Sequence, residues 1–322
     1  MITVGPSGID TLVLMNDVNI QCSINKESCE LCLRYGDKIL ADGMETKTAY
    51  NGMNNAVGSS RLGLKTAIYT VIGGDPNADR IMSTLKKEKV DARYVQQEKK
   101  MRTDASVVVH YKGERTIMVY HELYTYHMPK FASTDWFYLT SFGKKWEPFY
   151  KQFAAHVKKT GSHLGFNPGT YQLKAGPKKL KHIFALTTAL FLNIEEARVM
   201  TGIKQEKNVL ELLEGMRKLG AKIAVLTDGP KGSYAYDGEQ ALFQKTLEPT
   251  PVIERTGCGD SYATGFIAGY SHTNSLVEAM RWGTINAAGV LQKIGPQDGL
   301  RTKDEMQKLL KKHKGLQPVS LK

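Results

Sequence analysis

The sequence lacks the features that mark secreted, membrane-spanning or zinc-binding proteins. It has only 4 cysteines in 322 residues, too few for a disulfide framework, so we expect reduced thiols in a cytoplasmic protein. Cys29 and Cys32 have the spacing of half a zinc site, but no second pair of cysteines or histidines completes it. No apolar run approaches the roughly 20 residues that a membrane span needs. The first residues carry no basic stretch ahead of their apolar part, which argues against a secretory signal.

The chain also lacks the G-x-x-x-x-G-K-[ST] pattern of P-loop enzymes, which excludes that class. Its formal net charge of +12 would suit a nucleic-acid-binding protein. However, the lysines occur as scattered pairs that flank expected helices, and no nucleic-acid-binding motif accompanies them. We therefore expect no nucleic-acid partner. A basic surface would also attract a nucleotide triphosphate, so the charge alone does not separate a nucleic-acid-binding protein from an enzyme that binds a nucleotide.

What the sequence does have is a glycine-rich turn that runs into a helix, ERTGCGDSYATGFIAGY at residues 254–270. Gly257, Cys258 and Gly259 have little side chain to block a ligand, and Asp260 falls in the first turn of the expected helix. The free N–H groups and the positive dipole end of that turn would bind a phosphate. The carboxylate is instead suited to take a proton from an attacking alcohol. The alternative is a plain helix start with an acidic first turn.

The segment TGCGDSYATGF resembles the second signature of the ribokinase-like PfkB family of carbohydrate and nucleoside kinases. This resemblance implies that Asp260 is the catalytic base and that the backbone amides of Gly257, Cys258 and Gly259 form the anion hole. Cysteine replaces the family's usual alanine, which we expect to matter little because the backbone makes the contact. Glu254 falls where ribokinase has the leading aspartate of a potassium site, so dependence on K⁺ stays open.

Residues 49–75 resemble the family's first signature, a glycine-rich start followed by an asparagine and a helix that ends in R-L-G. The residues that keep this frame are Gly52, Asn54, Asn55, Ala56, Arg61, Leu62 and Gly63. Glycine at Gly52 would let the backbone approach the substrate, and Asn54 can donate to and accept from its hydroxyls. The family's usual glycine pair is replaced by Ala49 and Tyr50. The Tyr50 ring would either face the acceptor or pack under a lid.

Two kinds of pattern alternate along the chain. Residues 12–48 and 100–121 alternate apolar and polar residues without intervening helices, which predicts paired strands with turns at residues 25–26 and 112–114. Residues 129–199 instead alternate strand-like and helix-like segments. Strands joined by helices predict a parallel sheet, because the crossovers place helices on its faces.

The resemblance implies a single ribokinase-like domain over residues 1–322, an α/β fold built as a three-layer α/β/α sandwich with a mainly parallel central sheet. The two strand-rich segments would form a small β-sheet lid over the substrate. The exposed face of that lid is a candidate surface for a homodimer. Asp10 matches the position at the end of the family's first strand whose aspartate binds two hydroxyls of the sugar.

The resemblance also implies where nucleotide and metal would bind. Asn193 and Glu196 match the N-x-x-E motif that orders hydrated Mg²⁺, and oxygen ligands acting largely through water suit this cation. The residues expected near ATP are Asn193, Thr227, Gly229, Gly232 and Asn286. Asp228 is an oddity in this segment, since a carboxylate near phosphates is unfavourable.

Taken together, these motifs predict the transfer of the γ-phosphoryl group of ATP, with magnesium, to a hydroxymethyl group of a sugar or nucleoside. Two alternatives stay open. The acceptor could already carry a phosphate that Arg102 and Arg115 clamp, although Asn51 replaces the lysine usual after the first-signature glycines. The protein could also be a non-catalytic binder that kept the fold, which the intact Asp260 and N-x-x-E motif argue against.

Overall fold

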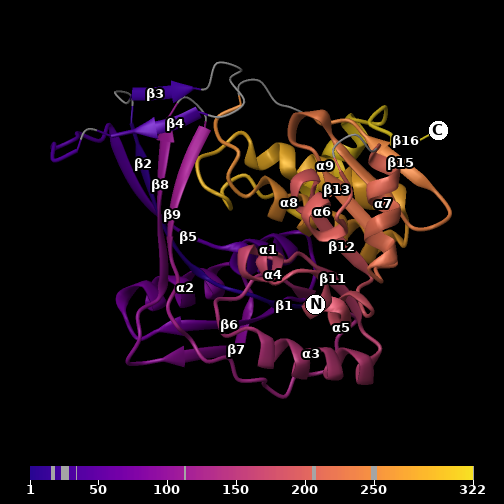
Figure 1. Ribbon diagram of the computed structural model, residues 1–322, viewed down its shortest axis with the longest axis horizontal. Helices are drawn as coiled ribbons and strands as arrows, with labels where there is room; N and C mark the ends of the chain where they lie inside the picture. The colour runs from indigo at the N-terminus through magenta and orange to yellow at the C-terminus, as the bar shows by residue number, and fades with distance from the viewer. Residues whose placement is uncertain are drawn as a thin grey trace.

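The computed structural model describes residues 1–15, 19–22, 29–33, 35–111, 114–204, 208–247 and 252–321. Within these ranges the chain forms one large sheet with helices on both faces and a smaller sheet that projects to one side (Figure 1). The turn expected at Asn25–Lys26, and Lys112 and Gly113 of the second expected turn, lie outside the described residues.

Ten strands of the described chain build the large sheet, in the order β16-β15-β14-β13-β12-β11-β10-β1-β6-β7. The strands from β13 to β7 in this order pair in parallel, whereas β14, β15 and β16 pair antiparallel. The bounds are β1 Ile2–Val4, β6 Ala67–Gly73, β7 Asp91–Glu98, β10 Trp136–Leu139, β11 His163–Phe166, β12 Ala189–Asn193, β13 Ile223–Thr227, β14 Ser233–Tyr236, β15 Ala241–Gln244 and β16 Val319–Ser320. The mainly parallel sheet predicted from the alternation of strand and helix is confirmed.

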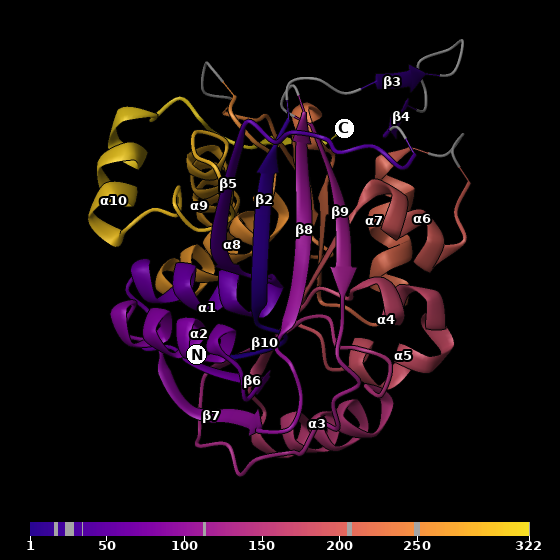
Figure 2. The ribbon, with the colours of Figure 1, turned by 90° about the vertical axis from the view of Figure 1, so that its left-hand side faces the viewer.

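Helices cover both faces of this sheet, so the three-layer sandwich is also confirmed (Figure 2). The bounds are α1 Asn51–Arg61, α2 Pro76–Lys87, α3 Glu147–Thr160, α4 Thr170–Ala175, α5 Pro177–Phe184, α6 Ile194–Thr201, α7 Val209–Lys218, α8 Cys258–Thr273, α9 Leu276–Val290 and α10 Lys303–Lys312. Successive residues of β10 face opposite layers, because side chains alternate along a strand. Phe137 packs in the core with Phe149 of α3, and Tyr138 packs with Phe266 of α8. None of the described helices is long and apolar enough to cross a membrane.

The smaller sheet has four strands in the order β5-β2-β8-β9, and we call it the lid sheet. The bounds are β2 Gly8–Leu14, β5 Gly43–Ala49, β8 Asp104–Tyr111 and β9 Glu114–Tyr120. The lid begins earlier than the expected residue 12, because the chain leaves the large sheet through a short bend between Val4 and Gly8. Asp10 therefore lies inside a lid strand and not at the end of a central strand. A hairpin of β3 Asn19–Cys22 and β4 Cys29–Cys32 lies beyond the lid sheet (Figure 1).

Candidate active site

Two cavities meet at the N-terminus of α8. The lid cavity, of about 340 Å³, has a lining that includes Asp10, Tyr50, Asn54, His121, Glu196 and Asp260. The second, which we call the helix cavity, measures about 360 Å³ and has a lining that includes Asn193, Thr227, Gly229, Gly232, Cys258 and Gly259. Arg115 of the lid strand β9 borders both. The fold thus gathers most of the residues predicted from the sequence around one helix terminus.

Two amide side chains from α1 hold the carboxylate of Asp260. Asn51 Nδ2 donates to Oδ1 at 3.1 Å, and Asn54 Nδ2 donates to Oδ2 at 2.8 Å. Burial raises the pKa of Asp260 to about 6, because the two amide donors offset only part of the desolvation and the charge of Asp10 adds to it. A pKa near neutrality suits a group that accepts a proton during a reaction. The sequence did not reveal Asn51 as a partner, since 209 residues separate it from Asp260.

The start of α8 needs glycine at Gly257 for two reasons. Its φ of 77° lies in the left-handed region, and a Cβ there would stand 2.5 Å from Cβ of Pro296. Gly257 borders the lid cavity, while Cys258 and Gly259 border the helix cavity. The Cys258 N–H makes a long contact of 3.4 Å to the Arg255 carbonyl. The first turn of α8 thus lies between the cavities, and the N–H groups of such a turn have no carbonyl partner within the helix, which suits the binding of an anion.

The side chain of Cys258 adds no negative charge to this helix start, because its thiol is neutral. Burial raises the pKa of this thiol to about 12, so it carries no negative charge at neutral pH. A thiolate at this position would repel a phosphate, whereas the neutral side chain does not. The departure from the family's usual alanine is thus compatible with an anion site.

Asp10 projects from β2 into the lid cavity and is 7% exposed. Ser106 on the neighbouring strand β8 donates a short hydrogen bond to its Oδ1, and the two residues face each other in register. Burial raises the pKa of Asp10 to about 6, and the charge of Glu254 contributes in the same direction. The carboxylate is therefore available to accept hydrogen bonds from a bound polyol above this pH.

Tyr50 both borders the lid cavity and contacts the lid sheet. Its hydroxyl donates to the Tyr120 carbonyl at 3.4 Å, and its ring meets the edge of His121 at 5.7 Å. Its φ of 79° is unusual for a residue with a side chain, which matches a position where the family carries glycine. Nδ1 of His121 in turn lies 2.8 Å from Oδ2 of Asp104, and the His121 ring centroid lies 6.1 Å from that of Tyr171. His121 and Tyr171 were not identified from the sequence.

Among the predicted substrate contacts, Gly52 needs correction and Asn54 has a further role. Gly52 does not border either cavity, and a Cβ there would stand 2.6 Å from the backbone of Gly5, so the glycine allows α1 to pack on the bend after β1. Asn54 borders the lid cavity but is 4% exposed. Its amide donates to Asp260 and its oxygen accepts from Gln297, so it orients the carboxylate in addition to any contact with the substrate.

Asn193 and Glu196 form a reciprocal cap at the start of α6. Asn193 Oδ1 accepts from the Glu196 N–H at 2.8 Å, and Glu196 Oε2 accepts from the Asn193 N–H at 3.0 Å. Glu196 borders the lid cavity and Asn193 the helix cavity. Burial raises the pKa of Glu196, an effect that a bound cation would oppose. These oxygens fit the water-mediated binding of a hard divalent cation between the cavities.

The segment after β13 turns along the helix cavity. Thr227, Gly229 and Gly232 border it, and the Asp228 N–H donates to the Gly232 carbonyl at 2.9 Å to close the turn. The Asp228 carboxylate forms an ion pair with Lys231 Nζ at 3.6 Å, and Asp228 is not among the residues described as lining this cavity. A carboxylate in this segment is therefore compatible with a nucleotide.

The expectation for Asn286 is corrected. Its side chain is fully buried, donates to the Ser261 carbonyl at 2.7 Å and accepts from the Arg301 N–H at 3.0 Å. It therefore joins α9 to α8 and does not border the helix cavity. The neighbouring residues Ala287 and Ala288 border the cavity in its place.

Glu254 is buried beside the start of α8. Its Oε2 accepts from the Gly295 N–H at 2.7 Å, and its Oε1 lies 3.6 Å from Nε2 of His110 on β8. Among the described residues, neither Oε1 nor Nε2 has a hydrogen-bond partner. Burial lowers the pKa of His110, which favours a neutral imidazole at neutral pH. A buried carboxylate oxygen without a hydrogen-bond partner offers one oxygen ligand to a monovalent cation.

A model of the pfkB family carbohydrate kinases matches residues 10–303. The chain is also similar to a cytidine kinase from Thermococcus kodakarensis, with 37% identity over 135 residues. This match covers 41% of the chain and 47% of that enzyme, so it spans about half of the relative's length.

Solved structures show the same fold. Arabidopsis thaliana ribokinase, complexed with ribose and ATP, matches with a TM-score of 0.79 at 21% identity, over 96% of this chain and 98% of that chain. A nucleoside kinase from Burkholderia thailandensis, in complex with inosine, matches with a TM-score of 0.78 at 16% identity, over 98% and 99% of the two chains. At these identities the likeness concerns the fold, and it confirms the ribokinase-like architecture. With the family match over residues 10–303, the chain belongs to the PfkB family of carbohydrate kinases, which are phosphotransferases with an alcohol group as acceptor.

Proposed function

We propose that the protein transfers the γ-phosphoryl group of ATP to a hydroxymethyl group of a sugar or nucleoside, with Asp260 as the base. The observation that carries this proposal is the position of the Asp260 carboxylate. It borders the lid cavity in the first turn of α8, and its pKa is raised to about 6. An alcohol bound in the lid cavity would lose its proton to Asp260 as it attacks a phosphate held by the amides of Gly257, Cys258 and Gly259.

The helix cavity is the proposed site for ATP. Thr227, Gly229 and Gly232 border it on one side and Ala287 and Ala288 on the other, so phosphate and base would meet backbone and small side chains. Asn193 and Glu196 would hold hydrated Mg²⁺, which supplies positive charge that neutralises the phosphates. Arg115 borders both cavities and would stabilise the group in transfer. The lid sheet would exclude water that otherwise hydrolyses ATP.

For the acceptor, the lid cavity favours a nucleoside. Its wall carries the rings of Tyr50, His121 and Tyr171, and a flat base can stack on aromatic side chains. The similarity to a cytidine kinase supports the same choice.

An acceptor that already carries a phosphate is disfavoured. Arg102 is absent from the described lining of the lid cavity, and Asn51, in the position of the usual lysine, donates to Asp260. Two arginines were expected to clamp a phosphate, and of these Arg115 borders the lid cavity. A non-catalytic binder would not need Asp260 held by two amide donors.

We also propose that K⁺ binds beside Glu254, whose Oε1 is buried without a hydrogen-bond partner among the described residues. A cation there would stabilise the loop that forms the anion hole. Rates measured in K⁺ and in a tetramethylammonium salt at equal ionic strength test this, and equal rates would contradict it.

The outer face of the lid sheet supports the proposal of a homodimer. Met44, Val107 and Met118 are exposed there, with Met118 at 54%. Sedimentation velocity of the protein and of Met118→Asp tests this, and a monomeric wild type at micromolar concentration would contradict it.

The main proposal is tested by acceptor-dependent formation of ADP. We expect wild-type protein to form ADP with at least one nucleoside or sugar and Asp260→Asn to lose this activity. Acceptor-dependent turnover that survives in Asp260→Asn would remove Asp260 from the reaction.

A further inference from the structure

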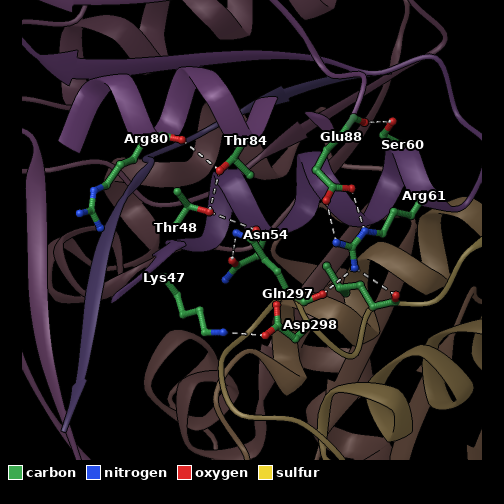
Figure 3. A network of polar contacts seen from close by, with 11 residues as sticks. Lys47, Thr48, Asn54, Ser60, Arg61, Arg80, Thr84, Glu88, Gln297 and Asp298 are labelled. Carbon is green, nitrogen blue, oxygen red and sulfur yellow. Dashed lines mark hydrogen bonds and ion pairs between the residues drawn. The ribbon is translucent and has the colours of Figure 1, made fainter. Parts of the chain in front are cut away.

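Behind the pair formed by Asp260 and Asn54 lies another buried amide, Gln297, in the loop between α9 and α10. Gln297 Nε2 donates to Asn54 Oδ1 at 3.0 Å, although 243 residues separate the two (Figure 3). Gln297 is 7% exposed and Asn54 is 4% exposed. Gln297 does not border the lid cavity, so it would act on the reaction only through Asn54.

The hydrogen-bonding groups allow only one direction along this chain of contacts. An ionised Asp260 carboxylate can only accept, so Asn54 must present its NH₂ group to it. The Asn54 oxygen then points the other way, and a donor must face it because an unsatisfied buried carbonyl is costly. The NH₂ group of Gln297 supplies that donor. A flipped Asn54 would instead aim its oxygen at the carboxylate and repel it.

Gln297 is itself held at both its backbone and its side chain. Its backbone carbonyl accepts from Arg61 Nη1 at 2.7 Å, and Arg61 makes two bonds of 2.8 Å to the carboxylate of Glu88. Its Oε1 accepts from the Thr48 hydroxyl of β5 at 3.4 Å (Figure 3). The loop is thus attached to α1 and to the lid sheet by separate contacts, which keep the Gln297 amide in one place.

We propose that Gln297 is a positioning residue for the catalytic base, because it locks the Asn54 amide in the orientation that presents NH₂ to Asp260. This inference rests on the proposed function, in which Asp260 accepts the proton of the acceptor. Loss of the lock lets Asn54 rotate, and the carboxylate then loses a donor that stabilises its charged form. Asp260 becomes protonated at higher pH, and its orientation toward the acceptor is no longer fixed.

The test uses Gln297→Glu and Gln297→Met, which keep the size of the side chain. An ionised glutamate cannot donate to Asn54 Oδ1, and methionine offers no donor at all. We expect kcat at neutral pH to fall about tenfold, the factor that corresponds to one lost hydrogen bond of typical worth. The KM for ATP should not change, and the acidic limb of the kcat profile should move toward higher pH.

The other ionisable groups that face the lid cavity are Asp10, Glu196, Arg115, His121, Tyr50 and Tyr171. They are the same in all these variants, but Gln297→Glu adds a carboxyl of its own. The shift of the Gln297→Met profile is therefore the one that reports on Asp260 alone. Gln292→Met is the matched control, since Gln292 lies on the same segment, is exposed and bonds to Arg301 at 2.9 Å. Its profile should coincide with that of the wild type.

A double-mutant cycle separates positioning from simple destabilisation. In an Asn54→Ala background Gln297 has no amide to orient, so Gln297→Met should no longer shift the acidic limb. The inference would be overturned if the acidic limb of the kcat profile stayed unchanged in both Gln297 variants. It would also be overturned if the effects of Gln297→Met and Asn54→Ala on that limb simply added. An active Asp260→Asn would instead refute the proposed function, whereas an inactive Asp260→Asn with unaltered Gln297 variants would refute this inference alone.

Discussion

Replacement of Asp260 by asparagine removes the proposed base while keeping the size of the side chain. A positioned base is worth about 10²- to 10⁴-fold in rate, which corresponds to about 2.7–5.4 kcal/mol of the barrier. We therefore expect kcat to fall by about that factor. The KM for ATP should change little, because Asp260 borders the lid cavity and not the helix cavity.

The same substitution also acts on stability, through two opposing effects. It removes a buried charge whose raised pKa costs folding free energy at neutral pH, and it removes one hydrogen-bond acceptor. The Asp260 carboxylate accepts from both Asn51 and Asn54, whereas the amide of asparagine has one accepting oxygen. One donor then loses its partner, which costs about 1–3 kcal/mol if it stays buried. Thermal unfolding measured beside the rate separates this effect from catalysis. A folded Asp260→Asn variant with near-normal turnover in a coupled ADP assay would refute the reasoning.

Two further substitutions test the metal and acceptor sites. Glu196→Gln should raise the Mg²⁺ concentration for half-maximal rate, because a charge behind the hydrated ion is lost while glutamine can still cap the Asn193 N–H. Glu195→Gln, at the exposed neighbouring residue, is the control. An unchanged Mg²⁺ titration of Glu196→Gln would contradict the assignment. Tyr50→Gly removes a ring from the lid cavity and relieves a φ of 79°, so relative kcat/KM between nucleosides and free sugars should change by about tenfold or more. An equal loss for all acceptors would make Tyr50 purely structural.

The sequence predicted those parts of the site that one local segment determines. A glycine turn that opens a helix is encoded within a few residues, so the left-handed Gly257 and the position of Asp260 in the first turn of α8 were predictable. Asn193 and Glu196, predicted as a magnesium motif, are three apart and also cap α6 reciprocally, a local feature that their spacing permits. The mainly parallel sheet followed from the alternation of strands and helices.

What the sequence did not reveal depends on contacts between distant segments. Asn51 and Gln297 meet the Asp260–Asn54 pair only after α1, α8 and the loop before α10 have packed together. The same packing explains the errors. Gly52 was predicted to contact the substrate, but the missing side chain there lets α1 pack against Gly5. Asn286 was predicted to contact the nucleotide, but its side chain joins α9 to α8. Composition and spacing carry no signal for which face of a helix is turned toward a cavity.

The central claim is that this chain phosphorylates an alcohol from ATP, and ADP formation across an acceptor panel tests it most directly. The panel contains nucleosides, free pentoses and hexoses, and sugar phosphates, each assayed with ATP, Mg²⁺ and K⁺. We expect ADP to form together with an equal amount of phosphorylated product, with nucleosides turned over best. ADP formation at the acceptor-free background rate for every member of the panel, by protein that still binds ATP, would contradict the account.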